Sequence, residues 1–122
     1  METITSSREI SQAFSDGRRV HTRYLTLIVI PAKQHDHKGR VAFIAGKKLG
    51  NAVWRNSAKR RMREIARSLQ APWVGVDVIF LAKGNITKAS YSKVLQACEE
   101  VIQREGLFEG EKNLGIRKTG SL

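Results

Sequence analysis

Four basic side chains recur at every fourth position in one stretch of the chain: Arg55, Lys59, Arg63 and Arg67. On an α-helix this spacing places them in a single stripe, because residues i and i+4 share a face. Like charges at this spacing oppose helix formation by about 0.2–0.5 kcal/mol per pair, and a bound phosphate backbone would remove that repulsion. Arginine, which dominates the stripe, suits bidentate phosphate contacts and stacking on bases. The stripe therefore predicts a nucleic-acid-binding surface; the alternative is a solvated face that only maintains solubility.

The overall composition also favours a polyanionic partner. The 122 residues suit one domain, and 22 Lys and Arg against 11 Asp and Glu give a formal charge of +11. Such a charge is relieved when a bound polyanion releases its condensed counterions. An anionic membrane is the competing partner, but no apolar run approaches the roughly 20 residues of a spanning helix, and residues 1–8 lack a signal peptide's hydrophobic region. Cys98 is the only cysteine, which argues against a disulfide framework, so we expect a cytoplasmic protein with no membrane partner.

Side chains that could catalyse phosphodiester cleavage are scattered along the sequence. A protein nuclease needs clustered carboxylates that hold metal ions, or a pair of histidines. The candidate carboxylates fall in four different predicted elements: Asp16, Asp36, Glu64 and Asp77. His35-Asp36-His37 could begin a metal site, but the sequence places no third ligand. We therefore predict no catalytic residue and no metal site, and we disfavour a nuclease that acts without a partner.

The elements that must position the basic stripe follow from capping and hydrophobic periodicity. Ser6 and Glu9 form a capping-box pattern that begins a first helix, and Asp16-Gly17 ends it. Alternating or continuous apolar residues predict three strands, over 18–30, 40–46 and 77–83. Helical periodicity predicts two further helices, over 52–70 and 87–106. The order αββαβα predicts an α+β sandwich of helices on a small mixed sheet, a single domain over residues 1–108 followed by a flexible tail over 109–122.

Periodicity also assigns side chains to faces. One arc of the basic helix is apolar and must face the sheet: Trp54, Ala58, Met62, Ile65, Ala66 and Leu69. Strand parity separates two sets in the first strand, Leu25, Leu27 and Val29 on one face and Tyr24, Thr26 and Ile28 on the other. Gly46 and Gly50, just before the basic helix, allow a positive φ and close backbone approach. Cys98 is expected in the core, and Trp73 is expected to fix the linker before the third strand.

The run from Gly46 to Glu64, GKKLGNAVWRNSAKRRMRE, resembles the signature of the bacterial ribonuclease P protein subunit. Three other segments are similar to that family: Ile10–Gly17, Arg40–Ala45 and Asp77–Lys83, the last followed by a helix that contains Tyr91. The similarity extends over about residues 8–108. It implies a left-handed βαβ crossover, against the usual right-handed preference, in a fold shared with the second domain of a small-subunit ribosomal protein.

The resemblance implies a subunit that assists a catalytic RNA in removing the 5′ leader of precursor tRNA, in a 1:1 ribonucleoprotein. Mg²⁺ would be held through the RNA, and no cofactor by the protein alone. The residues implied for binding the catalytic RNA are Lys47, Lys48, Asn51, Arg55, Asn56, Lys59, Arg60 and Arg63. Those implied for a cleft that binds the single-stranded leader are Phe14, Tyr24, Thr26, Ile28 and Lys83. For Phe14, a place in the core is an equal alternative.

Two positions depart from the family's pattern. Ser57 follows Arg55-Asn56 where the signature carries a second arginine, so the motif loses one charge. Ile28 stands where many relatives carry an aromatic residue, which weakens base stacking there. A ribosomal or other structural RNA-binding protein stays open as an alternative, although it needs neither the signature nor the leader cleft. A DNA-binding helix-turn-helix is disfavoured, because strands flank the basic helix.

Overall fold

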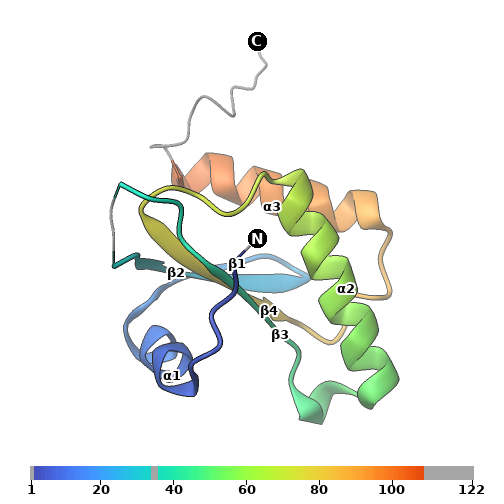
Figure 1. The fold of residues 1–122 in the computed structure, drawn as a ribbon. Helices are drawn as coiled ribbons and strands as arrows, with labels where there is room; N and C mark the ends of the chain where they lie inside the picture. The colour runs from blue at the N-terminus through green and yellow to red at the C-terminus, as the bar shows by residue number, and fades with distance from the viewer. Residues whose placement is uncertain (1, 34–35, 109–122) are drawn as a thin grey trace.

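A four-stranded sheet in the order β1-β2-β4-β3 carries helices on both of its faces (Figure 1). The arrangement is that of a computed structural model, which describes residues 2–33 and 36–108. The helices are α1 (Ser7–Asp16), α2 (Ala52–Ser68) and α3 (Tyr91–Glu105), with a 3-10 turn, η1 (Lys47–Leu49), before α2. The strands are β1 (Arg18–His21), β2 (Leu25–Pro31), β3 (Val41–Ile44) and β4 (Val76–Ala82). These elements confirm the predicted α+β sandwich; the expected tail over 109–122 lies outside the described residues.

The strand predicted over residues 18–30 is in fact two antiparallel strands, β1 and β2, so the order is αβββαβα. Thr22 makes the turn between them. Its hydroxyl donates to the Leu25 carbonyl at 2.8 Å and accepts from the backbone N–H groups of Tyr24 and Leu25, each at 3.0 Å. A threonine hydroxyl can support a turn without the glycine or asparagine that usually marks one. The prediction was wrong here because composition gave no turn signal.

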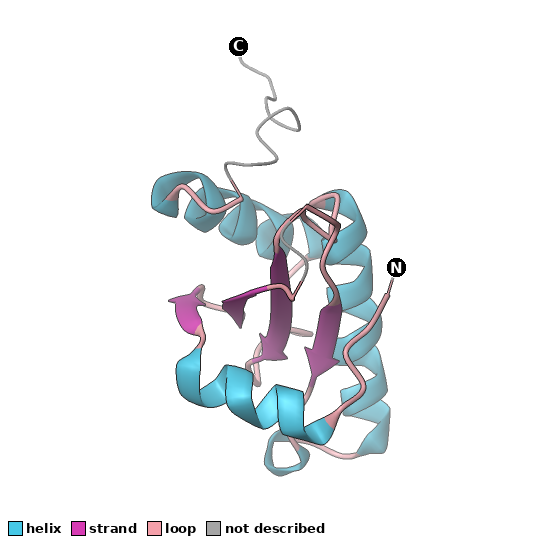
Figure 2. Cartoon of the chain, turned by 60° about the vertical axis from the view of Figure 1, so that its left-hand side comes forward, coloured by secondary structure: helices cyan, strands magenta, loops and turns pink. Residues whose placement is uncertain are grey.

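The main core lies between the sheet and the pair α2 and α3, on the face opposite α1 (Figure 2). The predicted apolar arc of α2 is confirmed, because its central members are fully buried: Ala58, Met62, Ile65 and Ala66. Cys98 of α3 is in this core as predicted, and burial raises the pKa of its thiol to about 12. Trp73 is 2% exposed and stacks on Phe108 with ring centroids 3.8 Å apart, which confirms its role in fixing the linker. None of the helices in the described part of the chain is long and apolar enough to cross a membrane.

The helix α1 covers the other face of the sheet. Beneath it is a second, smaller group of buried side chains: Ile4, Ala13, Ile28, Ala42 and Ile79. Ser6 caps the helix as predicted, by accepting a hydrogen bond from the Glu9 N–H at 3.3 Å. Gly17 lets the helix end close against β2, because a Cβ there would lie 2.4 Å from Ile28 Cγ2. The position of α1 over the sheet is therefore set by tight contacts.

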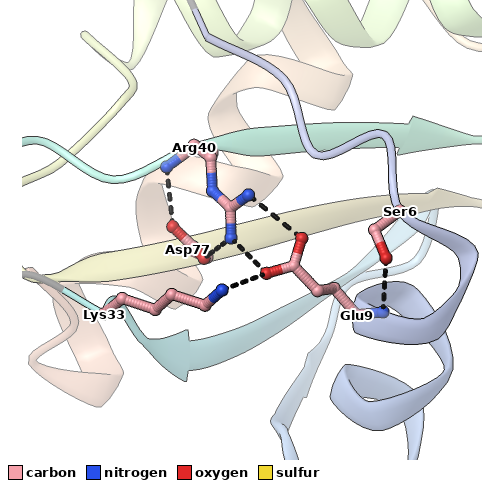
Figure 3. Close-up of polar contacts among 5 residues, drawn as sticks. All are labelled: Ser6, Glu9, Lys33, Arg40 and Asp77. Atoms are coloured by element: carbon pink, nitrogen blue, oxygen red, sulfur yellow. Dashed lines mark hydrogen bonds and ion pairs between the residues drawn. The ribbon is translucent and has the colours of Figure 1, made fainter.

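Arg40 joins α1 to the sheet through two carboxylates (Figure 3). Its guanidinium donates to Glu9 of α1 at 3.1 and 3.0 Å and to Asp77 of β4 at 2.9 Å. The backbone N–H of Arg40 donates to the second Asp77 oxygen at 2.7 Å, and Lys33 forms an ion pair with Glu9 at 3.3 Å. Hydrogen bonds from Arg40 and then Lys33 lower the pKa of Glu9 to about 2, and those from Arg40 to both carboxylates raise the pKa of Arg40. We call these four residues the Arg40 network.

The chain before α1 runs beside the edge strand β3. The Val41 N–H donates to the Glu2 carbonyl at 3.0 Å, and the Ile4 N–H donates to the Val41 carbonyl at 2.8 Å. Thr3 forms a parallel bridge with Val41 between these two bonds. Exposed strand edges offer unpaired backbone groups to other chains, and this segment satisfies those at the start of β3.

Candidate nucleic-acid interface

The outward side of α2 and the turn before it carry a dense set of cations. We call this set the α2 basic surface; its members are Lys47, Lys48, Arg55, Lys59, Arg60, Arg63 and Arg67, and all are exposed or half-buried. Within the residues that the structure describes, every ion pair is made by residues outside this surface. Glu64, the one acid of α2, is also absent from these pairs. The predicted basic stripe is therefore a charged surface whose side chains form no ion pair with a carboxylate of the described residues.

Contacts within the protein hold two of these side chains, Arg55 and Arg63, in place. Arg55 Nη1 donates to the Gly50 carbonyl at 3.3 Å, and the Arg63 guanidinium carbon lies 5.7 Å from the centroid of the Phe43 ring. Asn51 caps α2, because its side-chain oxygen accepts from the Trp54 N–H at 2.9 Å. The amide N–H groups of Asn51 then stay available as donors to a ligand. The predicted positions for RNA binding thus lie together at the start and along the outer side of α2.

Arg61 belongs to α2 but points away from the α2 basic surface. Its Nη1 donates to the carbonyl of Ile86 at 3.0 Å and to the carbonyl of Ala89. These bonds fasten α2 to the segment before α3. Arg61 therefore does not replace the arginine that Ser57 removes from the signature, whereas the exposed Arg67 extends the charged side toward the end of the helix.

The connection from β3 to α2 is extended at both of its glycines, so neither uses the positive φ that glycine allows. Gly46 has φ −67° and Gly50 has φ 176°. Gly50 is needed for a different reason, since a Cβ at this position would lie 2.8 Å from side-chain atoms of Trp54. The glycine allows the backbone to pass beside the indole, and Lys47 and Lys48 are exposed just before it.

On the α1 face, one row of side chains crosses all four strands. The register aligns His21 of β1 with Thr26 of β2, Leu81 of β4 and Ile44 of β3, and directly paired residues share a face. We call these four residues the open row, because His21 is exposed and Leu81 and Ile44 are half-buried. In the next row, Ile28, Ile79 and Ala42 are buried under α1. The row starts at the sheet edge formed by β1 and ends on β3, next to the connection to α2.

Phe14 of α1 packs with the same apolar group as two members of the open row, Leu81 and Ile44. It is half-buried, so it is neither a fully enclosed core residue nor a free side chain. The Arg19 guanidinium carbon lies 5.5 Å from the Phe14 ring centroid, and Arg19 Nη2 donates to the Phe14 carbonyl at 2.9 Å. An aromatic ring beside a cation is the combination that single-stranded nucleic acid sites use.

Two of the predicted leader-binding residues share this face with Phe14, but their exposure is low. Thr26 Oγ1 lies 2.9 Å from His21 Nδ1, and Thr26 is 3% exposed. Ile28 is fully buried under α1. Their neighbours Arg19 and His21 are more accessible, and sequence reasoning missed both because it treated residues 18–30 as one strand.

Tyr24 and Lys83 lie elsewhere. Tyr24 was expected beside Thr26, but it stands in the turn before β2 and packs against the main core on the opposite side of the sheet. Lys83 Nζ donates to the carbonyl of Thr22, in that same turn, at 2.5 Å. The structure thus brings Phe14, Thr26 and Ile28 together and separates Tyr24 from them.

The carboxylates do not gather into a site for a metal ion. Among residues 2–33 and 36–108, no group of three or more His, Cys, Asp or Glu side chains could hold one. Glu9 and Asp77 approach each other, but the guanidinium of Arg40 lies between them and binds both (Figure 3). His37 Nδ1 lies 2.8 Å from Asp36, while His35, the third member of the weak metal motif, lies outside the described residues.

Comparison with known proteins gives one consistent family. The Ribonuclease P family model matches residues 1–106. The ribonuclease P protein component of Symbiobacterium thermophilum is 34% identical over 110 residues, covering 88% of this chain and 94% of the relative. That of Syntrophomonas wolfei is 31% identical over 111 residues, covering 90% and 92%.

Solved structures give the same picture of the fold. The RNase P protein of Staphylococcus aureus superposes with a TM-score of 0.73 at 25% identity, covering 88% of this chain and 98% of that one. The RNase P protein of Thermotoga maritima superposes with a TM-score of 0.70 at 19% identity, covering 85% and 97%. The arrangement of three helices on a four-stranded sheet is therefore similar to that of solved relatives across nearly their whole length.

Proposed function

The chain belongs to the ribonuclease P protein family, and from this premise we propose how its two faces divide the work of tRNA 5′ maturation. The α2 basic surface binds the catalytic RNA of the enzyme, and the open row with Phe14 and Arg19 binds the single-stranded 5′ leader of precursor tRNA. The protein joins one RNA in a 1:1 ribonucleoprotein of the cytoplasm. The RNA carries out cleavage with Mg²⁺ that it holds itself.

The observation that carries this proposal is the lack of ion pairs at the α2 basic surface. Seven cations lie in η1 and on α2, and the ion pairs of the described residues involve none of them. Their mutual repulsion is relieved when phosphates replace condensed counterions. Arg55 and Arg63 are already held by Gly50 and Phe43, so less side-chain entropy is lost when they bind phosphate.

The role of the open row rests on its chemistry and on its place. Its uncovered members and Phe14 offer apolar and aromatic surface, and Arg19 adds a cation. Single-stranded RNA is bound by such combinations without duplex geometry. The row ends on β3, whose chain leads directly through η1 into α2, so a strand that leaves the RNA-bound face can continue along it.

The use of two carboxylates as partners of Arg40 supports the assignment of chemistry to the RNA. Glu9 and Asp77 both accept hydrogen bonds from Arg40, which leaves neither free to act as a general base. We expect purified protein alone to leave precursor tRNA intact, and addition of the catalytic RNA to give 5′ cleavage at low Mg²⁺. Cleavage at the same position by an RNA-free preparation would contradict the proposal.

A pair of substitutions tests the α2 basic surface. Arg60→Ala/Arg63→Ala removes two cations that make no ion pair within the described residues. Arg8→Ala/Lys38→Ala removes two exposed cations that lie outside the α2 basic surface. The first variant should bind the catalytic RNA more weakly, with a salt slope shallower by about 1.4–1.8 log units for two lost phosphate contacts. The control pair should change little. Equal losses in both variants would show that net charge, rather than this surface, determines binding.

A further inference from the structure

An open groove of about 490 Å³ lies between the β1–β2 turn and one side of α3, on the face of the sheet opposite the open row. We propose that this α3 groove binds the part of the leader farthest from the cleavage site, beyond the nucleotides on the open row. The inference rests on the proposed function and extends it to a second set of residues. Those it uses are His21, Arg23, Tyr24, Lys93, Glu100 and Arg104, all of which line the groove.

The lining has the chemistry of a single-strand site. Arg23, Lys93 and Arg104 are exposed cations, and the described structure gives Arg23 and Lys93 no ion pair. Tyr24 is half-buried, and no hydrogen bond to its hydroxyl is made within the described residues. Glu100 is the one acid among the lining residues, and a carboxylate there can accept from the exocyclic amino group of a base. Cations for phosphates and a ring for stacking are thus combined in one groove.

The path to this groove follows from the sheet order. The open row runs from Ile44 on β3, beside the α2 connection, to His21 on β1, which is the opposite edge. His21 belongs to both places, because its side chain meets Thr26 in the open row and the residue also lines the α3 groove. A strand that leaves the α2 side and crosses the row therefore reaches the groove by passing over β1. The leader nucleotides nearest the cleavage site lie on the open row, and those farther from the cleavage site lie in the α3 groove.

The length of the row sets which leaders reach the groove. Three inter-strand spacings of about 4.8 Å make the row roughly 14 Å long. At a stacked rise of ~3.4 Å per nucleotide this corresponds to about four nucleotides. Leaders of about four nucleotides should end on the row, and only longer leaders should contact Arg23 and Lys93.

The experiment measures the affinity of the protein–RNA complex for precursor tRNAs with leaders of about four and about ten nucleotides, and for mature tRNA. Arg23→Ala/Lys93→Ala is compared with the control pair Arg8→Ala/Lys38→Ala, all four being exposed side chains. The groove variant should bind the long-leader substrate on the order of 10-fold more weakly, with a salt slope shallower by about 1.4 log units. Its affinity for the short-leader substrate and for mature tRNA should be unchanged.

Tyr24 provides an independent variant for the same groove. Tyr24→Phe keeps the ring and should bind the long leader as the wild type does, whereas Tyr24→Leu should lose about 5-fold or more, the value of one stacked base. Circular dichroism checks that Tyr24→Leu is folded, since this residue also packs against the main core.

Three results would overturn the inference. Unchanged affinity of Arg23→Ala/Lys93→Ala for the long leader would show that the groove is unused. An equal loss for all three RNAs would show that the two charges act only through the overall field. If the wild-type complex itself does not distinguish precursor from mature tRNA, the proposed leader role of the open row fails as well. The first of these results, obtained with a wild-type complex that does prefer precursor to mature tRNA, removes the groove alone.

Discussion

Replacing Arg40 by methionine tests the contact that holds α1 to the sheet. The change keeps the length of the apolar stem but removes the charge between Glu9 and Asp77. The Asp77 side chain is 4% exposed, so the variant leaves a buried carboxylate with the Arg40 backbone N–H as its remaining donor. Removing one partner of a buried pair costs roughly 3–5 kcal/mol, and because Arg40 is partly exposed and that backbone bond persists, we expect about 2–3 kcal/mol of lost stability.

Thermal unfolding followed by circular dichroism measures this loss. For a domain of this size about 3–6 °C of Tm corresponds to 1 kcal/mol, so Arg40→Met should lower Tm by roughly 6–18 °C. Arg18→Met is the matched control, because it breaks the ion pair between Arg18 and Glu105 at 2.7 Å. The Arg18 side chain is 53% exposed and the Glu105 side chain is 37% exposed. An exposed pair contributes about 0–1 kcal/mol, so the control should unfold close to the wild type.

A second substitution tests whether the stability lost in Arg40→Met comes from the unpaired Asp77 carboxylate. If the cost of Arg40→Met comes from the stranded Asp77 charge, adding Asp77→Asn should recover part of the lost stability, because the amide oxygen still accepts from the Arg40 N–H. A loss no larger than that of Arg18→Met would refute the reasoning. A double variant less stable than Arg40→Met would also contradict it.

Three further predictions concern residues with clear partners. Arg40 and Lys33 lower the pKa of Glu9 to about 2, below its value of about 4.3 in the unfolded chain. The contribution of Glu9 to stability is therefore full above about pH 5 and is lost as the pH falls toward 2. The free energies of unfolding of the wild type and of Glu9→Gln, measured across this pH range, should differ at about pH 5 and converge near pH 2. Arg61→Ala should destabilise the fold by about 1–3 kcal/mol in urea unfolding while leaving RNA affinity unchanged, the reverse of Arg63→Ala; weaker RNA binding by a folded Arg61→Ala would contradict the assignment. Gly50→Ala places a Cβ 2.8 Å from Trp54 and should cost about 1–3 kcal/mol through overpacking; unchanged stability would mean that the indole shifts freely.

Periodicity and capping were sufficient to predict most of the fold. The apolar arc of α2 and the capping by Ser6 depend on local spacing, which the sequence displays directly. The turn at Thr22 could not be predicted from residue type, because a threonine within a β-branched run is typical of a strand until its hydroxyl is seen to bind three backbone groups. The misplaced Tyr24 follows from that single error, since parity holds only within one unbroken strand.

The candidate site was predictable where charge alone decides it. Arg55, Lys59 and Arg63 share a helix face at any tertiary arrangement, so their common orientation followed from the helix. Arg61 shows the limit of this argument, because its carbonyl partners come from residues 86 and 89, which are far away in sequence. The open row is likewise a product of strand register across β1, β2, β4 and β3. Periodicity within each segment does not contain that register.

The two tryptophans of the chain occupy places that make them separate optical reporters. Trp73 is enclosed and stacked on Phe108 at an interplanar angle of 4°, so its emission changes when the core opens. Trp54 is half-buried at the start of α2, with its indole N–H on Thr87 at 3.2 Å, and a bound RNA would alter its surroundings without disturbing Trp73. A Trp73→Phe variant therefore gives a single intrinsic fluorophore for RNA association, and Trp54→Phe gives one for unfolding. Both events become measurable without an attached dye, each in its own single-tryptophan variant.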